Sequence, residues 1–173
     1  PSLSCWAVHP RHTDLAGTYR CDCGARMVDI EELKAKFLNQ DFDTKEFKLD
    51  PQKMVTVAKA SGEMRPEFID PQNPEFQAPP AYLCSLASGR HLPIDFPSLG
   101  GIPMDGGKAV TIHKPVHAGQ TLIGRTHLHD IYDKKGRSGR MILVVARMEL
   151  YDTEDNHLAS ADSRMVIREK EAA

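Results

Sequence analysis

The sequence has few of the features that mark secreted, membrane-spanning or nucleic-acid-binding proteins. Only four of its 173 residues are cysteine, too few for a disulfide scaffold in a chain of this length. No apolar run approaches the roughly 18 residues that cross a bilayer, and the first residues lack a basic-then-apolar signal pattern. The net charge of −2 gives no general attraction to nucleic acid. We therefore expect a cytoplasmic protein that binds neither nucleic acid nor membrane.

The length fits one domain with its own core. We expect an irregular N-terminal arm over residues 1–28, a domain over residues 29–168, and a tail over residues 169–173. The candidate zinc ligands in the arm are His9, His12, Cys21 and Cys23. Cys-x-Cys is not the usual zinc-hairpin spacing, so no metal site is expected. Packing of the arm on a partner is favoured over zinc binding.

Helical signals dominate the first half of the domain. Asp29 is a suitable N-cap for a helix ending near Phe37, and Asp50 with Pro51 begins a second helix that stops near Gly62. Residues 79–88 are small or apolar on all sides, which is typical of a buried helix. Residues 90–107 are rich in proline and glycine and predict a long loop.

The second half of the domain alternates between apolar and polar residues, as half-buried strands do. Polar turns separate the segments, so we expect an antiparallel meander. A curved antiparallel sheet wrapped around one buried central helix satisfies this order of elements and gives an α+β fold. The expected strands are residues 46–49, 108–114, 121–132, 141–151 and 158–168.

Four stretches, in this order, resemble the MaoC-like hydratases and dehydratases, a hot-dog family, and its N-terminal type in particular. The first, residues 60–68, reads Ala-Ser-Gly-Glu-Met-Arg-Pro-Glu-Phe and is similar to the family's Gly-Asp-x-Asn-Pro-x-His. Glu63 stands where the family has Asp, Arg65 where it has Asn, and Phe68 where it has His. The other three stretches are residues 78–83, 113–122 and 130–139.

The resemblance implies a hot-dog fold and (R)-specific hydration of a 2-enoyl-CoA or acyl-carrier thioester, or the reverse dehydration. It implies no cofactor, because the CoA thioester is the substrate. It also implies a homodimer, a heterodimer with another MaoC-like chain, or a larger oligomer, with sites at the interface. In the family the Asp and the His move protons, and Phe68 has no proton to move.

Glu63 is the candidate catalytic residue, and the alternative is that it ends a helix or pairs with Arg65. The candidate residues for binding substrate or CoA are Arg65, Phe68, Pro80, Tyr82, Lys134, Lys135, Arg137 and Arg140. The four basic residues near position 137 suit the phosphates of CoA, and they also suit an ordinary solvated hairpin tip.

Three functions compete. In the first, the chain is a hydratase or dehydratase subunit whose MaoC-like partner supplies the Asp and the His. In the second, the chain is a self-sufficient hydratase that uses Glu63 as its base. In the third, it is a non-enzymatic acyl-CoA-binding or assembly module, and thioesterase activity is a more distant fourth.

Overall fold

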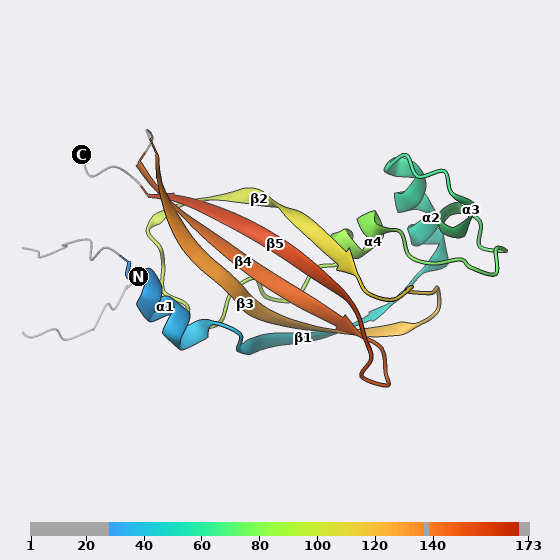
Figure 1. Cartoon of the computed structure of the whole chain (residues 1–173), viewed down its shortest axis with the longest axis horizontal. Coiled ribbons are helices and arrows are strands. Elements are labelled where there is room, and N and C mark those ends of the chain that lie inside the picture. The colour runs from blue at the N-terminus through green and yellow to red at the C-terminus, as the bar shows by residue number, and fades with distance from the viewer. Residues whose placement is uncertain (1–27, 137–138, 170–173) are drawn as a thin grey trace, which may run out of the picture.

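A computed structural model describes residues 28–136 and 139–169. Arg137, almost all of the expected N-terminal arm and most of the expected tail lie outside these residues. The described chain forms an elongated sheet with short helices at its ends and on one face (Figure 1). Within the described residues, no helix is long and apolar enough to cross a membrane.

The first two helices begin where the sequence predicts. Helix α1 (Ile30–Phe37) is capped by Asp29, whose carboxylate accepts hydrogen bonds from the backbone N–H groups of Glu31 and Glu32. Helix α2 (Pro51–Ala60) is capped in the same way by Asp50. Both caps satisfy N–H groups that the first turn of a helix leaves unpaired.

Helices α3 (Pro66–Ile69) and α4 (Pro80–Ser85) are each less than two turns long. The prediction of a buried helix reaching residue 88 is therefore too long by one turn. Lys45 Nζ binds the carbonyl oxygen of Ala87 at 2.8 Å, and the Asp43 carboxylate accepts the N–H of Gly89 at 2.7 Å. These tertiary hydrogen bonds take the place of helical ones after Ser85.

All strand pairs in the five-stranded sheet are antiparallel, in the order β1-β3-β4-β5-β2. Only β3, β4 and β5 form the expected meander, because β2 pairs with β5 and leaves β1 and β2 as the two edges. The strands are β1 (Asp41–Lys48), β2 (Gly101–Ile112), β3 (Thr121–Gly136), β4 (Gly139–Tyr151) and β5 (His157–Glu169).

Strand β2 corrects the predicted loop over residues 90–107, since its first seven residues belong to the sheet. Its pairing with β5 is interrupted by a bulge between Asp105 and Lys108. Asp105 Oδ1 accepts the N–H of Gly107 at 2.8 Å, and Gly107 has a φ of 91°. Glycine takes that conformation without strain, and an edge strand tolerates Pro103.

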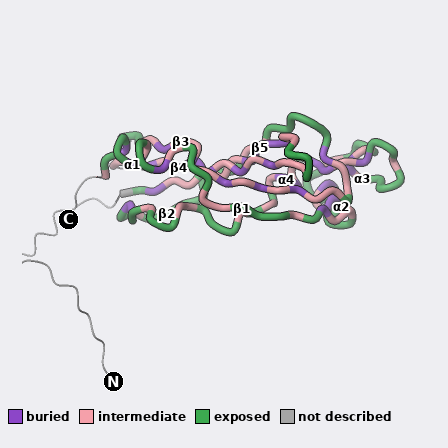
Figure 2. Tube along the Cα trace, turned by 90° about the horizontal axis from the view of Figure 1, so that it is seen from below, coloured by how far each residue is buried: buried purple, intermediate pink, exposed green. Residues whose placement is uncertain are grey.

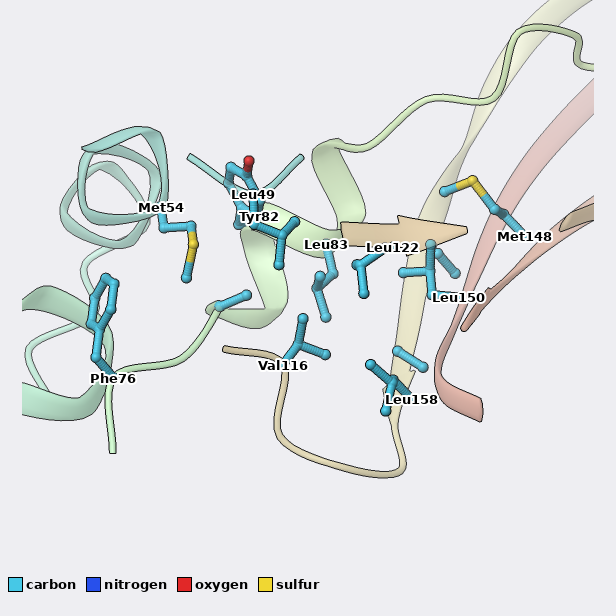
Figure 3. Packing of buried hydrophobic residues seen from close by; sticks show 13 residues of the cluster. Leu49, Met54, Phe76, Tyr82, Leu83, Val116, Leu122, Met148, Leu150 and Leu158 are labelled. Atoms are coloured by element: carbon cyan, nitrogen blue, oxygen red, sulfur yellow. The ribbon is translucent and has the colours of Figure 1, made fainter. Parts of the chain in front are cut away.

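One face of the sheet carries two hydrophobic clusters, and we call it the inner face. The first cluster lies against α2 and α4 and includes Leu83, Leu122 and Leu150 (Figure 3). The second lies against α1 and includes Leu128 and Ile142. Buried residues accordingly follow the central strands, while the edges are more exposed (Figure 2). An α+β fold with a curved antiparallel sheet is confirmed, with a shorter helix than expected.

Candidate functional site

The motif segment follows α2 directly. Gly62 ends the helix with a φ of 78°, and the N–H of Glu63 still binds the carbonyl oxygen of Ala58 at 2.9 Å. The Glu63 side chain then turns toward Arg65. Arg65 Nε lies 3.0 Å from Glu63 Oε1, and Arg65 Nη2 lies 2.8 Å from Oε2. Both oxygens of the candidate base are therefore held by one guanidinium group.

Backbone groups hold the Glu63 carboxylate as well. Oε1 accepts the N–H of Met64 at 3.0 Å and the N–H of Arg65 at 3.2 Å. The side-chain hydrogen bonds from Arg65, together with these backbone bonds, lower the pKa of Glu63 from 4.5 to about 2. A general base works best when its pKa lies near the operating pH. A carboxylate with this pKa is a poor acceptor for the proton of a water molecule.

Phe68 occupies the second proton-handling position of the motif. It lies in α3 with 6 % of its surface exposed, and the Arg65 guanidinium stacks on its ring, 4.4 Å from the ring centroid. A second carboxylate also approaches Arg65, because Glu67 Oε1 lies 3.8 Å from Arg65 Nη1. Arg65 thus organises a small surface cluster of two carboxylates and one aromatic ring. The structure brings Glu63, Arg65 and Phe68 together, and this cluster contains no histidine.

The two candidate residues of α4 differ in burial. Pro80 is exposed at the start of the helix, whereas Tyr82 is buried in the first hydrophobic cluster. Figure 3 shows Tyr82 packed beside Leu49 and Leu83 between α2 and the sheet. Tyr82 therefore positions α4, and its role in substrate binding stays a prediction.

The basic candidates lie far from the motif. Lys134, Lys135 and Arg140 belong to the hairpin of β3 and β4, at the end of the sheet opposite α2 and α3 (Figure 1). Strand β3 has 16 residues, which span roughly 50 Å when extended. One chain therefore does not assemble Glu63 and these residues into a single site. Arg137 lies outside the described residues.

Arg140 is also engaged within its own hairpin. Its Nε donates to Asp133 Oδ2 at 2.7 Å, and its Nη2 donates to the carbonyl oxygen of Val28 at 3.0 Å. The hydrogen bond from Arg140 is the main reason that the pKa of Asp133 is lowered. A role for these residues in binding CoA phosphates stays a prediction.

A small cavity on the inner face was not predicted from the sequence. It lies between the chain that follows α4 and the middle of strands β3, β4 and β5, and its volume of about 30 Å³ is enough for about one water molecule. Thr126 is buried on its floor, with 2 % of its surface exposed. The lining residues are Cys84, Leu86, Ala87, Ser88, His91, Lys108, Thr126, Ala146, Met148, Ala161, Asp162 and Ser163.

The opposite, outer face carries a polar network that the sequence did not predict either. Arg147 Nε lies 2.6 Å from Asp162 Oδ1, and His157 Nε2 lies 2.8 Å from Glu149 Oε2. His127 lies on the same face, with 14 % of its side chain exposed. Among residues 28–136 and 139–169, no three histidine, cysteine or acidic side chains are arranged to hold a metal ion. His9, His12, Cys21 and Cys23 lie outside that range.

Comparison with known proteins agrees with this architecture. The family model "FAS1-like, dehydratase domain region" matches residues 36–161, most of the chain. No curated protein matches the sequence.

Three solved structures resemble the fold. A MaoC-like dehydratase from Phytophthora capsici superposes with a TM-score of 0.60 and 23% identity over 82% of this chain, which spans 50% of that protein. The HadBC (3R-hydroxyacyl-ACP dehydratase) complex from Mycobacterium tuberculosis superposes with a TM-score of 0.54 and 19% sequence identity, and the match covers 75% of this chain and 99% of that one. The ChsH1–ChsH2 complex from the same organism superposes with a TM-score of 0.56 and 17% sequence identity, and the match covers 83% of this chain and 90% of that one. The chain therefore belongs to the FAS1-like dehydratase domain family, and its hot-dog fold is similar to that of these three structures.

Proposed function

We propose that this chain is one subunit of an acyl-thioester hydratase or dehydratase, and that a second MaoC-like chain supplies the catalytic Asp and His. The observation that carries the proposal is the bidentate pair between Arg65 and Glu63. Arg65 holds the Glu63 carboxylate, which stands at the motif's Asp position, in a form that accepts protons poorly. The His position holds Phe68, so the motif segment of this chain lacks both groups that hydration requires.

Histidines elsewhere in the described chain offer little in their place. His117 is the one tied to the segment between α3 and α4, where its Nδ1 lies 3.0 Å from the carbonyl oxygen of Phe76. His127 and His129 lie on β3 in contact with each other, and His113 and His157 lie beside Ser160 on the outer face. These contacts favour structural roles for the histidines over a replacement for the missing acid.

The edge strand β2 supports a partner of similar fold. It is 12 residues long, and its outer hydrogen-bonding groups have no strand beside them within the described chain. Ile102 and Met104 on this strand are 57% and 44% exposed. A long edge strand with exposed apolar side chains is a surface for pairing. Two of the similar structures, HadBC and ChsH1–ChsH2, are themselves complexes.

The experiment is to purify the tagged full chain from its native host and identify what accompanies it. We expect a second MaoC-like chain with an intact Gly-Asp-x-Asn-Pro-x-His. The reconstituted pair should hydrate enoyl-CoA substrates, while this chain alone should not. Glu63→Gln should leave the turnover of the pair within about twofold of normal, as should the neighbouring control Glu67→Gln, since a carboxylate held this way removes no proton.

Each competing function predicts a different result. A self-sufficient hydratase would turn over alone and lose that activity in Glu63→Gln. A binding module would bind acyl-CoA tightly yet stay inactive beside every MaoC-like companion. Recovery only as a homo-oligomer with no such companion would contradict the proposed heteromer.

A further inference from the structure

The two hydrophobic clusters of the inner face are separated by a strip of small residues. On β3 the strip consists of Gly124 and Thr126, which lie on the same face of the strand. Leu122 of the first cluster precedes them, and Leu128 of the second cluster follows. On β4 the strip continues with Ala146, which pairs with Leu128. The cavity of about 30 Å³ lies over this strip.

Residues 87–91, which we call the strap, form one wall of the cavity, and the strands form another. The strap leaves the first cluster at Leu86 and reaches the second cluster at Leu92. All of its residues except Ser88 are exposed. It belongs to the chain that runs along the sheet from α4 to the start of β2 (Figure 1). The strap is therefore a narrow bridge between the clusters, with space beneath it.

Two side chains of the edge strand β1, and no backbone pairing, hold the strap. Within the described part of the chain, residues 87–91 make no backbone–backbone hydrogen bond. Lys45 Nζ donates to the carbonyl oxygen of Ala87 at 2.8 Å, and the Asp43 carboxylate accepts the N–H of Gly89 at 2.7 Å. Both bonds are exposed, so water can replace either partner. A segment held in this way opens at a lower free energy than paired strands do.

Asp43 and Lys45 form a latch with two arrangements. They lie two residues apart on β1 and face inward, opposite Thr126 and Gly124 of β3. In the closed arrangement each of them binds the strap backbone. When the strap lifts, the two opposite charges are free to pair with each other and with water. Opening therefore leaves neither charge buried without a partner.

Lifting the strap exposes a continuous apolar groove on the inner face. The groove follows β3 from Leu122 to Leu128, a length of about 20 Å, and passes over Met148 and Ala146 of β4. Its floor carries no charged side chain, so a linear apolar chain suits it and a charged group does not. A ligand shifts the strap toward the open arrangement only when it binds that arrangement more tightly. An acyl chain meets this condition, because the closed cavity has no room for it.

We propose that residues 87–91 are a movable cover over a groove for an acyl chain, and that Asp43 and Lys45 hold this cover shut. The inference rests on the proposed function, because it takes the ligand to be an acyl thioester. It deepens that function by assigning to this chain a groove for the acyl group and a latch that controls entry. The two clusters stay folded during opening, since Leu86 and Leu92 anchor the ends of the strap.

The test measures how fast a cysteine beneath the strap reacts with N-ethylmaleimide. Ala146→Cys places a thiol in the cavity wall, which the reagent reaches when the strap lifts. Ala159→Cys places a thiol in the first cluster, at a position that is 0% exposed and does not line the cavity. Peptide mass spectrometry separates these labels from those on the native cysteines. We expect Ala146→Cys to react about tenfold faster, because opening the strap costs less free energy than opening the cluster.

Breaking the latch should speed the reaction beneath the strap alone. Asp43→Ala combined with Lys45→Met removes both bonds to the strap, so labelling beneath it should rise about tenfold while labelling in the first cluster stays unchanged. The matched control is Glu46→Ala combined with Lys48→Met, an exposed acid and lysine with the same spacing on the outer face of β1. The control should change neither rate.

Trypsin cleavage after Arg90, an exposed residue of the strap, reports on opening without an added cysteine. The latch variant should be cleaved there faster than the unchanged protein, and the control at the normal rate. The acyl chain is tested on the full chain in the oligomer in which it is purified. Octanoyl-CoA at ten times its dissociation constant should slow the labelling of Ala146→Cys about tenfold, whereas CoA without an acyl group should leave it unchanged.

The outcomes separate the two proposals. Equal rates for the two cysteines, or a latch variant that behaves as its control does, would show that the strap does not open by itself and would overturn the inference. Labelling that octanoyl-CoA leaves unchanged would overturn it as well, because the groove would then admit no acyl chain. None of these measurements requires a MaoC-like companion, so failure to find one would overturn the proposed function alone.

Discussion

The Arg65 guanidinium donates two hydrogen bonds to the Glu63 carboxylate, one of 3.0 Å from Nε to Oε1 and one of 2.8 Å from Nη2 to Oε2. A motif whose frame suggests an active site thus holds an ion pair at the position of the base. The pair is local, formed between residues two apart. It lies in the segment between α2 and α3, where the helices fix its ends.

The first prediction concerns the titration of Glu63. Its pKa is lowered from 4.5 to about 2, chiefly by the Arg65 side chain, so Arg65→Gln should raise the midpoint toward 4.5. A lowered carboxyl pKa stabilises the fold above the unfolded value of 4.5, and that contribution is lost as the pH falls toward about 2. Carboxyl ¹³C NMR measures the midpoint directly.

Arg90→Gln is the matched control for that titration, because Arg90 is exposed and is not among the groups that shift the Glu63 pKa. It should leave the Glu63 midpoint unchanged. A midpoint near 4.5 in the unsubstituted protein would show that the ion pair does not form in solution.

The second prediction concerns Gly124, in the strip of small residues on the inner face. A Cβ added there would lie 2.8 Å from Met148 Sδ and 2.8 Å from Phe47 Cε2. Overpacking of a formed core costs about 1–3 kcal/mol, so Gly124→Ala should lower the free energy of unfolding by that amount. Urea denaturation measures it. In Gly136→Ala the new Cβ meets only Met141 Cε at 3.9 Å, and the change should stay within about 0.5 kcal/mol.

The third prediction concerns His127. Burial is the largest cause that lowers the pKa of its imidazole; Glu149 and Asp41 act in the opposite direction, and His129 and Arg147 add to the lowering. The ring is therefore neutral near pH 7, and its 3.8 Å approach to Asp41 is not an ion pair there. Stability should fall as the pH drops below about 6.5, because the unfolded chain takes up this proton first.

His127→Gln should reduce the loss of unfolding free energy between about pH 7 and pH 5, measured by urea denaturation across that range. His91→Gln, at an exposed position, serves as the control and should keep the slope of the unchanged protein. Equal slopes in all three proteins would contradict a half-buried, neutral His127.

Local signals predicted the elements that local chemistry determines. Asp29 and Asp50 cap α1 and α2 through hydrogen bonds to residues two and three positions ahead, so the sequence locates both helix starts. The alternation of residues 158–168 likewise located β5 within one residue at each end. The family followed from four short stretches taken in order.

Non-local contacts account for what the sequence did not predict. Lys108 reaches across 24 residues to the carbonyl oxygen of Cys84 in the last turn of α4, and Lys45 reaches across 42 residues to that of Ala87, just beyond the helix. Strand β2 begins among Pro103 and two glycines, a composition typical of loops, because pairing with β5 holds it in the sheet. The cavity depends on the register of three strands, which no single stretch of sequence reveals.

The fourth prediction concerns the exposed side chains of β2. Ile102 and Met104 lie opposite Arg168 and Val166 of β5 and are 57% and 44% exposed. Replacing both by lysine puts two charges on the edge strand, and lysines on an edge are a known barrier to strand pairing. The double substitution should weaken association with the partner chain that we propose at least tenfold, because the charges would have to be buried in the interface. Sedimentation velocity measures the change.

The same double substitution should leave the fold intact, since exposed positions rarely change stability by more than about 0.5 kcal/mol. Ile94→Lys is the control, because Ile94 is 76% exposed and lies in the loop before β2, away from its pairing edge. It should associate normally. Unchanged association of the double variant would show that the partner binds elsewhere. An equal loss of association in the double variant and in Ile94→Lys would show that added surface charge, and not the position on the edge strand, weakens association. A drop in association confined to the β2 variant, with unfolding free energies equal across the set, assigns the interface to that strand.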